Sequence, residues 1–156
     1  MLVIKAAIEA NQKQKKRVIE KIISKMNGVS GKIIGILGLS FKPDTDDMRE
    51  APSIDIIRGL VKSGAKIHAY CPEGIKEARW RLADIEKNII YCADEYSIAN
   101  DADGIVLITE WNQFRGMNLK NVRERMKDNF YFDLRNVYVK DSNVRKIFKY
   151  YPIGQE

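Results

Sequence analysis

Charged side chains crowd the segment 38–50, which directly follows a run of apolar residues at 33–37. In an open sheet of parallel strands, ligands bind just beyond the carboxyl ends of the strands. Arginine offers phosphate oxygens a planar fork, and lysine offers them a mobile point charge. The segment is therefore a candidate binding site for an anionic ligand. Its charged residues include Lys42, Asp44, Asp46, Asp47 and Arg49.

The three aspartates of this segment could instead hold a metal ion. A calcium loop of the EF-hand type needs glycine at its sixth position and glutamate at its twelfth. Counted from Asp44, those positions hold Arg49 and Asp55. Short acidic side chains also cap helix starts and stabilise turns. We therefore expect the aspartates to act as a helix cap or in a turn, and we predict no metal site.

Patterns for other chemistry are incomplete. Gly35 and Gly38 do not have the G-x-G-x-x-G spacing that lets a backbone approach a pyrophosphate. The single histidine, His68, lies between Ile67 and Ala69 in an expected strand, so we interpret it as structural. With one histidine, no Cys-His or Ser-His-Asp set is evident. We expect no catalytic residue in this chain.

The elements that must position these residues alternate between strand and helix. A chain of 156 residues fits one domain with an appended element. Alternation of this kind predicts an α/β fold: a doubly wound, mostly parallel sheet of five or six strands, Rossmann-like but incomplete. Strands are expected at 32–37, 66–70, 89–91, 104–108 and 131–133, with a short edge strand at 147–151. Helices are expected at 52–63, 75–85, 95–100 and 119–126.

A long helix is predicted at 2–26, before the sheet begins. Ile4, Ile8, Ile19, Ile22 and Met26 recur at helical spacing. Such a helix is about 37 Å long at a rise of 1.5 Å per residue. A small sheet cannot cover that length, so part of the apolar stripe should face a partner. We expect a homodimer through this helix.

The net charge of +6 comes entirely from this region. Residues 1–32 hold eight Lys or Arg and two Glu, and the remaining residues hold 19 of each sign. A nucleic-acid binder usually carries a basic stripe across the whole domain. We therefore favour a solvated helix face and expect no nucleic-acid partner, with a basic-helix nucleic-acid binder as a weaker alternative.

A doubly wound order of 3-2-1-4-5 would bring distant loops together, because strands one and four are neighbours where the order reverses. Lys42 and Arg49 follow strand one, Glu110 and Trp111 follow strand four, and Arg135 follows strand five. Two or three cations beside an aromatic ring suit a nucleotide diphosphate.

Several motifs, in this order, resemble the UDP-glucose/GDP-mannose dehydrogenase family. The resemblance is to the C-terminal, UDP-binding domain and the end of the central helix before it. It covers nearly the whole chain. The motifs are Asn11 with Gln14, GLSFKPDTDDMRE at 38–50, Thr109-Glu110-Trp111, Asp133-Leu134-Arg135-Asn136 and Ile153-Gly154.

The resemblance implies roles for four residues. Phe41, Lys42 and Arg135 would contact the UDP-sugar, and Arg49 would reach NAD. Two positions depart from the family pattern. Leu134 stands where glycine is frequent, and Cys71 stands where an aspartate is common.

The resemblance also implies a function. Such enzymes oxidise the primary alcohol of a UDP-sugar such as UDP-glucose to a carboxylate, in two NAD-dependent steps, and supply polysaccharide biosynthesis. They use a cysteine nucleophile and an N-terminal Rossmann domain, both expected upstream of this chain. Residues 1–28 would be the tail of the dimerisation helix and 29–156 the UDP-sugar-binding domain. Alone, the chain should bind rather than catalyse. A stand-alone nucleotide-binding or regulatory module is the alternative.

The sequence also indicates a compartment. Cys71 and Cys92 are expected to be reduced, because a domain of this size needs no disulfide. No run of 18 apolar residues occurs, so we expect no membrane association. A cytoplasmic protein is predicted.

Overall fold

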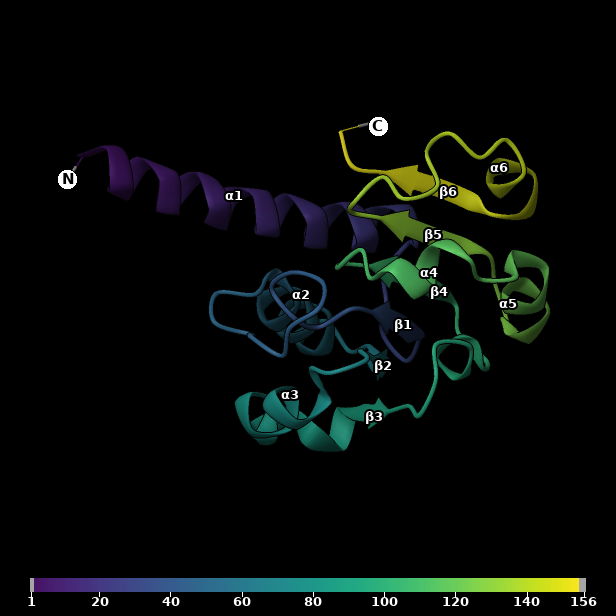
Figure 1. The fold of residues 1–156 in the computed structure, drawn as a ribbon, viewed down its shortest axis with the longest axis horizontal. Coiled ribbons are helices and arrows are strands. Elements are labelled where there is room, and N and C mark those ends of the chain that lie inside the picture. Colours follow the sequence, from purple (N-terminus) through teal and green to yellow (C-terminus); the bar gives the residue numbers. More distant parts are fainter. Residues whose placement is uncertain (1, 155–156) are drawn as a thin grey trace.

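The computed structural model describes residues 2–154. Within this range six strands form one sheet in the order β3-β2-β1-β4-β5-β6, and every neighbouring pair is parallel. Figure 1 shows them from β6 at the top to β3 at the bottom. The predicted doubly wound order is confirmed, and the expected edge strand adds to β5. The strands are β1 (Ile33–Leu37), β2 (Lys66–Tyr70), β3 (Ile89–Tyr91), β4 (Gly104–Leu107), β5 (Phe130–Asp133) and β6 (Lys149–Pro152).

The helices follow the predicted positions, with three differences. The segment 75–85 breaks at Leu82, where α3 gives way to the 3-10 helix η1. Two helices of one turn, α4 and α6, were not predicted, and α6 delays the start of β6 to Lys149. The helices are α1 (Leu2–Lys25), α2 (Pro52–Lys62), α3 (Ile75–Arg81), η1 (Ala83–Asn88), η2 (Ser97–Ala99), α4 (Asn112–Arg115), α5 (Leu119–Arg125) and α6 (Val144–Ile147).

Two glycines let helices pack closely on opposite faces of the sheet. Ile34 pairs with Gly104, so these two residues point to the same face, and Gly35 points to the other. A Cβ atom on Gly104 would lie 3.1 Å from the sulfur of Met26, the residue that follows α1. A Cβ atom on Gly35 would lie 2.7 Å from the carbonyl oxygen of Ile98 in η2. Helix α1 therefore covers one face and η2 the other.

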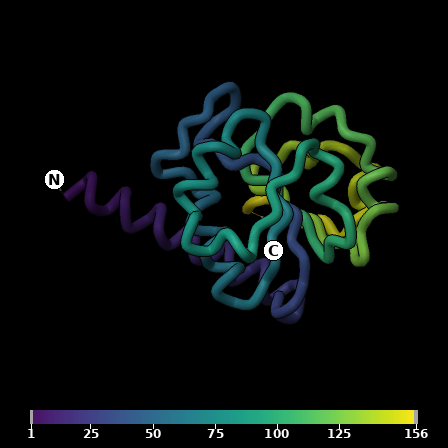
Figure 2. Tube along the Cα trace, turned by 90° about the horizontal axis from the view of Figure 1, so that it is seen from below, coloured from purple at the N-terminus to yellow at the C-terminus, as the bar shows by residue number. Residues whose placement is uncertain are grey.

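Only the C-terminal half of α1 packs on the sheet. Ile22 and Met26 are buried, whereas Ile4 and Ile8 are 62% and 57% exposed. Figures 1 and 2 show the N-terminal half extending away from the body of the domain. Gly28 follows the end of the helix: its φ is +89°, and its amide donates to the carbonyl of Ile23.

Two further observations concern the helices and the cysteines. In residues 2–154, no helix has the length and apolar character needed to cross a bilayer. Cys71 and Cys92 are free thiols, and burial raises the pKa of the Cys92 thiol.

Gly38 joins β1 to the loop that follows it. Its amide donates to the carbonyl of Tyr70 on β2 over 2.9 Å. Its φ is +92°, and a Cβ atom there would lie within 2.7 Å of both side-chain and backbone atoms of Thr109. Glycine is needed here both for the conformation and for the close approach of the two chain segments.

Gly38→Ala should destabilise the domain by on the order of 3 kcal/mol, because it combines left-handed strain with overpacking against backbone. Urea unfolding measures the effect. Gly116→Ala is the control, because its φ is −97° and nothing lies within 4 Å of the added carbon. That variant should stay within about 0.5 kcal/mol of the parent. Equal effects of the two substitutions would contradict this account of Gly38.

His68 lies in β2, the strand in which it was predicted. It is half-buried, and its Nδ1 atom has no hydrogen-bond partner among the described residues. Burial lowers the pKa of His68 from the ordinary 6.5, although the nearby charge of Asp101 opposes the shift.

The free energy of unfolding should therefore fall as the pH drops through 6.5, because the unfolded chain takes up a proton more readily than the folded one. This residue can contribute at most about 1.4 kcal/mol per pH unit. Urea titrations of the parent and of His68→Gln across this range isolate its contribution. Parallel pH profiles would show that His68 does not titrate differently on unfolding.

Candidate functional site

Ser40 ties the loop after β1 to the loop after β4. Its side chain is fully buried, and its hydroxyl donates to the carbonyl of Lys42 over 2.8 Å. The same hydroxyl accepts a hydrogen bond from the indole Nε1 of Trp111 at 3.1 Å. The backbone carbonyl of Ser40 accepts one from the hydroxyl of Thr109 at 2.6 Å. These bonds fix the backbone on both sides of Phe41.

The loop after β1 is closed by Asp47. Its carbonyl accepts from the amide of Phe41 at 2.7 Å, and its carboxylate accepts from the amide of Arg49 at 3.0 Å. The expected turn role of an aspartate is thus confirmed. The expected helix cap is wrong: α2 has Ala51 at its N-cap, with no side-chain cap bond, and Pro52 at its first turn. Proline leaves fewer amides to cap there.

Arg49 is held by the same aspartate. Its Nε and Nη2 atoms donate to the two oxygens of Asp47 at 3.1 and 3.0 Å. These hydrogen bonds hold the pKa of Asp47 down at about 2. The pair lies in solvent, since the Arg49 side chain is 79% exposed, so it adds little to stability.

A groove of about 700 Å³ lies beyond the carboxyl ends of β1, β4 and β5, where the strand order reverses. It runs between α1, the start of α2 and the loops that follow these strands. Its side chains include a half-exposed phenyl ring, Phe41, and the guanidinium of Arg135. The other lining residues are Ile8, Asn11, Gln12, Gln14, Lys15, Val18, Met48, Glu50, Ala51, Pro52, Ile54, Asp55, Ile56, Arg81, Ile108, Leu134 and Ile153.

Arg135 is anchored at its inner end. Its Nε donates to the carbonyl of Ile108 at 3.0 Å and lies 3.4 Å from the carboxylate of Glu110. Both contacts use Nε. Within the described chain, this leaves the two Nη groups available to bind a phosphate.

A buried carboxylate supports the backbone of Arg135. Asp133 is fully buried and accepts from the amides of Arg135 and Tyr138 at 3.1 and 2.9 Å. The hydroxyl of Tyr150 donates to it at 2.5 Å. Burial and this hydrogen bond raise the pKa of Tyr150. The turn that presents Arg135 is therefore fixed from inside the domain.

The structure brings together only some of the residues predicted for the site. Phe41 and Arg135 line the groove, whereas Lys42 and Arg49 are exposed neighbours that do not line it. Trp111 was expected to offer an aromatic ring to a ligand, and this is wrong. The residue is only 6% exposed, and its indole nitrogen donates to the hydroxyl of the buried Ser40.

Sequence reasoning missed two contributions to the groove. Arg81 lines the groove from the end of α3. It is far in sequence from the loop motifs, so no motif indicated that it would lie there. Lys15 lines the groove from α1. Its ammonium forms a 2.8 Å ion pair with Asp55, which ties α1 to α2 across the wall of the groove.

The groove has the chemistry of a binding site. Its described lining contains three cations, Lys15, Arg81 and Arg135, but no cysteine, histidine, serine or threonine. It can hold an anion through charge-assisted hydrogen bonds and an apolar ring against Phe41 and the apolar walls.

Comparisons with known proteins agree with this architecture. Residues 35–140 match the model of the UDP binding domain of the UDP-glucose/GDP-mannose dehydrogenase family. The chain is 37% identical over 154 residues to the UDP-glucose 6-dehydrogenase of Rhizobium meliloti, covering 97% of this chain and 34% of the relative. It is 35% identical over 152 residues to the UDP-glucose 6-dehydrogenase TuaD of Bacillus subtilis, covering 97% of this chain and 32% of the relative.

A solved structure is also similar. A UDP-glucose dehydrogenase from the hyperthermophilic archaeon Pyrobaculum islandicum superposes with a TM-score of 0.80 at 25% identity, over 97% of this chain and 32% of that one. The chain thus spans about a third of the length of these relatives. The matched model, the two enzymes and the shared fold agree, and the chain belongs to the UDP-glucose/GDP-mannose dehydrogenase family, as its UDP-binding domain.

Proposed function

We propose that this chain is the nucleotide-sugar-binding part of an NAD-dependent UDP-sugar 6-dehydrogenase and that its groove holds UDP. The observation that carries the proposal is the convergence of Phe41 and Arg135, from the loops after β1 and β5, on one groove at the switch point. Family membership and the names of the two relatives support it. On this assignment, residues 29–156 form the UDP-sugar domain and 1–28 the tail of a dimerisation helix.

Arg135 is the main phosphate ligand in this proposal. Its Nε is already bound and its backbone is fixed by Asp133, so little freedom remains to be lost when a diphosphate arrives. Phe41 supplies an exposed ring beside it. Lys42 stands next to that ring, outside the groove lining, and its long side chain can reach the mouth as a mobile charge.

Arg49 is assigned to NAD. Its exposed guanidinium suits a cofactor phosphate, but it must share or release the carboxylate of Asp47 to bind one. NAD, when bound, accepts the hydride from the sugar alcohol. This chain's part is to hold the nucleotide end of the sugar donor in place. Free thiols fit a cytoplasmic enzyme.

The exposed half of α1 is assigned to a second copy of the chain. Leu2, Val3, Ile4 and Ile8 form an apolar surface that the sheet does not cover, and Ile8 also reaches the groove. Exposed apolar patches often mark interfaces, and two-fold dimers are the most frequent assembly.

Arg135→Ala should weaken UDP binding by about 1.5–3 kcal/mol, or roughly ten- to a hundred-fold in Kd, because a charge-assisted phosphate contact is lost. Isothermal titration of the chain with UDP measures this. Arg115→Ala removes an exposed arginine that does not line the groove and should leave Kd unchanged. An unchanged Kd for UDP in the Arg135→Ala variant would show that the nucleotide binds elsewhere.

Replacing Ile4 and Ile8 by lysine should convert a dimer to a monomer, because two charges would be buried at the proposed interface. Sedimentation equilibrium reports the mass. Deleting α1 is a poorer test, since it would uncover the core contacts of Ile22 and Met26. Ser24→Lys, exposed on the packed half of the same helix, should remain dimeric. A monomeric parent chain at micromolar concentration would rule out this interface.

A further inference from the structure

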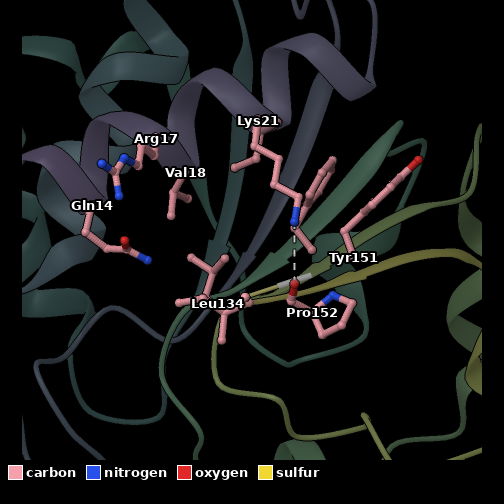
Figure 3. A pocket seen from close by; sticks show the side chains of 11 residues that line it. Gln14, Arg17, Val18, Lys21, Leu134, Tyr151 and Pro152 are labelled. Atoms are coloured by element: carbon pink, nitrogen blue, oxygen red, sulfur yellow. Dashed lines mark hydrogen bonds between the residues drawn. The ribbon is translucent and has the colours of Figure 1, made fainter. Parts of the chain in front are cut away.

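A second cavity, of about 320 Å³, lies on the other flank of α1. It is bordered by α1, the end of β5, and the end of β6 with the residues that follow it. Figure 3 shows Gln14 and Lys21 reaching from the helix toward Leu134 and Pro152, with the ring of Tyr151 at one end. Its lining residues are Gln14, Arg17, Val18, Lys21, Ile22, Phe132, Leu134, Tyr151, Pro152, Ile153 and Gly154.

This cavity adjoins the larger groove. Leu134 and Ile153 line both, as do Gln14 and Val18 on the helix. Leu134, which stands where the family pattern has glycine, therefore contributes an aliphatic side chain to each.

The walls of the second cavity are largely apolar. Val18 and Ile22 come from the helix, and Phe132, Leu134 and Ile153 come from the sheet side. The ring of Tyr151 stacks on Phe132 with centroids 5.2 Å apart, so one end of the cavity is a rigid aromatic surface. The volume is at the lower end of the range for small-molecule sites, about 300–1,000 Å³.

The charged side chains among the described lining residues are all positive. Arg17 and Lys21 lie one helical turn apart, and Lys25 continues the row. The ammonium of Lys21 donates to the carbonyl of Pro152 at 3.5 Å and lies 5.8 Å from the Tyr151 centroid, while that of Lys25 lies 5.4 Å from it. None of the described lining residues is acidic, whereas the larger groove contains Glu50 and Asp55.

We propose that this cavity is a second binding site, for a small organic anion. A phosphate or carboxylate would bind Arg17 and Lys21, and the apolar body of the ligand would pack between Val18 and Leu134. The planar guanidinium group can donate two parallel hydrogen bonds to either anion. The proposal does not depend on what the larger groove binds.

Phenyl phosphate, benzoate and neutral benzamide are suitable probes, because they share one ring and differ in charge. Amide chemical shifts of the labelled chain, followed by NMR, locate each probe. We expect phenyl phosphate or benzoate to change the amide chemical shifts of residues 17–21 and 151–154, and we expect benzamide to change none of them. The anion that binds with the higher affinity identifies the preferred anionic group. The shifts should persist with UDP present.

Arg17→Gln should lower the affinity for the anion about ten-fold, as expected for loss of one charge-assisted contact. Lys16→Gln, an exposed neighbour with the same charge change that lines neither cavity, should leave its affinity unchanged. The proposal is overturned if neither anion binds at millimolar concentration, if benzamide binds equally well, or if both substitutions act alike. Displacement of the probe by UDP, with shifts at Phe41 and Arg135, would assign it to the larger groove instead.

Discussion

The site depends on one buried junction, at which the chain leaving β1 meets the chain leaving β4. Gly38 allows the approach because a side chain there would overlap Thr109. Ser40 then holds it, through its carbonyl to Thr109 and its hydroxyl to Trp111. Phe41 is the next residue, so the geometry of the groove mouth follows from these bonds. All of them are shielded from water, and breaking any one leaves a buried polar group unpaired.

The two arginines assigned to ligands differ in how firmly each is held before a ligand binds. Arg135 stands on a carboxylate that is itself held by Tyr138 and Tyr150 in the core. Arg49 is held by Asp47 at the surface. The first arrangement is rigid and costs little entropy on binding, whereas the second can exchange partners. This difference fits the division of labour we propose, with UDP bound mainly by this domain and NAD only touched by it.

Much of the fold could be predicted because buried parallel strands are continuous apolar runs, and β4 and β5 are buried at every residue. The helices α4 and α6 could not, since four residues carry no periodicity. In the site, motif order identified Phe41 and Arg135. It could not identify Arg81 or the ion pair of Lys15 with Asp55, because both depend on how α3 and α1 pack. Trp111 was misjudged because the sequence does not reveal that this residue is buried with its indole nitrogen bonded to Ser40.

Helix α1 is one uninterrupted element from Leu2 to Lys25, and only its C-terminal half is embedded in the domain. Its position on the domain is set by the packing of Ile19 against Gly59, by the ion pair of Lys15 with Asp55, and by Met26, which follows the helix and packs against Gly104. Asn11 and Gln14 line the groove from the same helix, so the shape of the groove on this side depends on how the helix is held and not on the sheet alone.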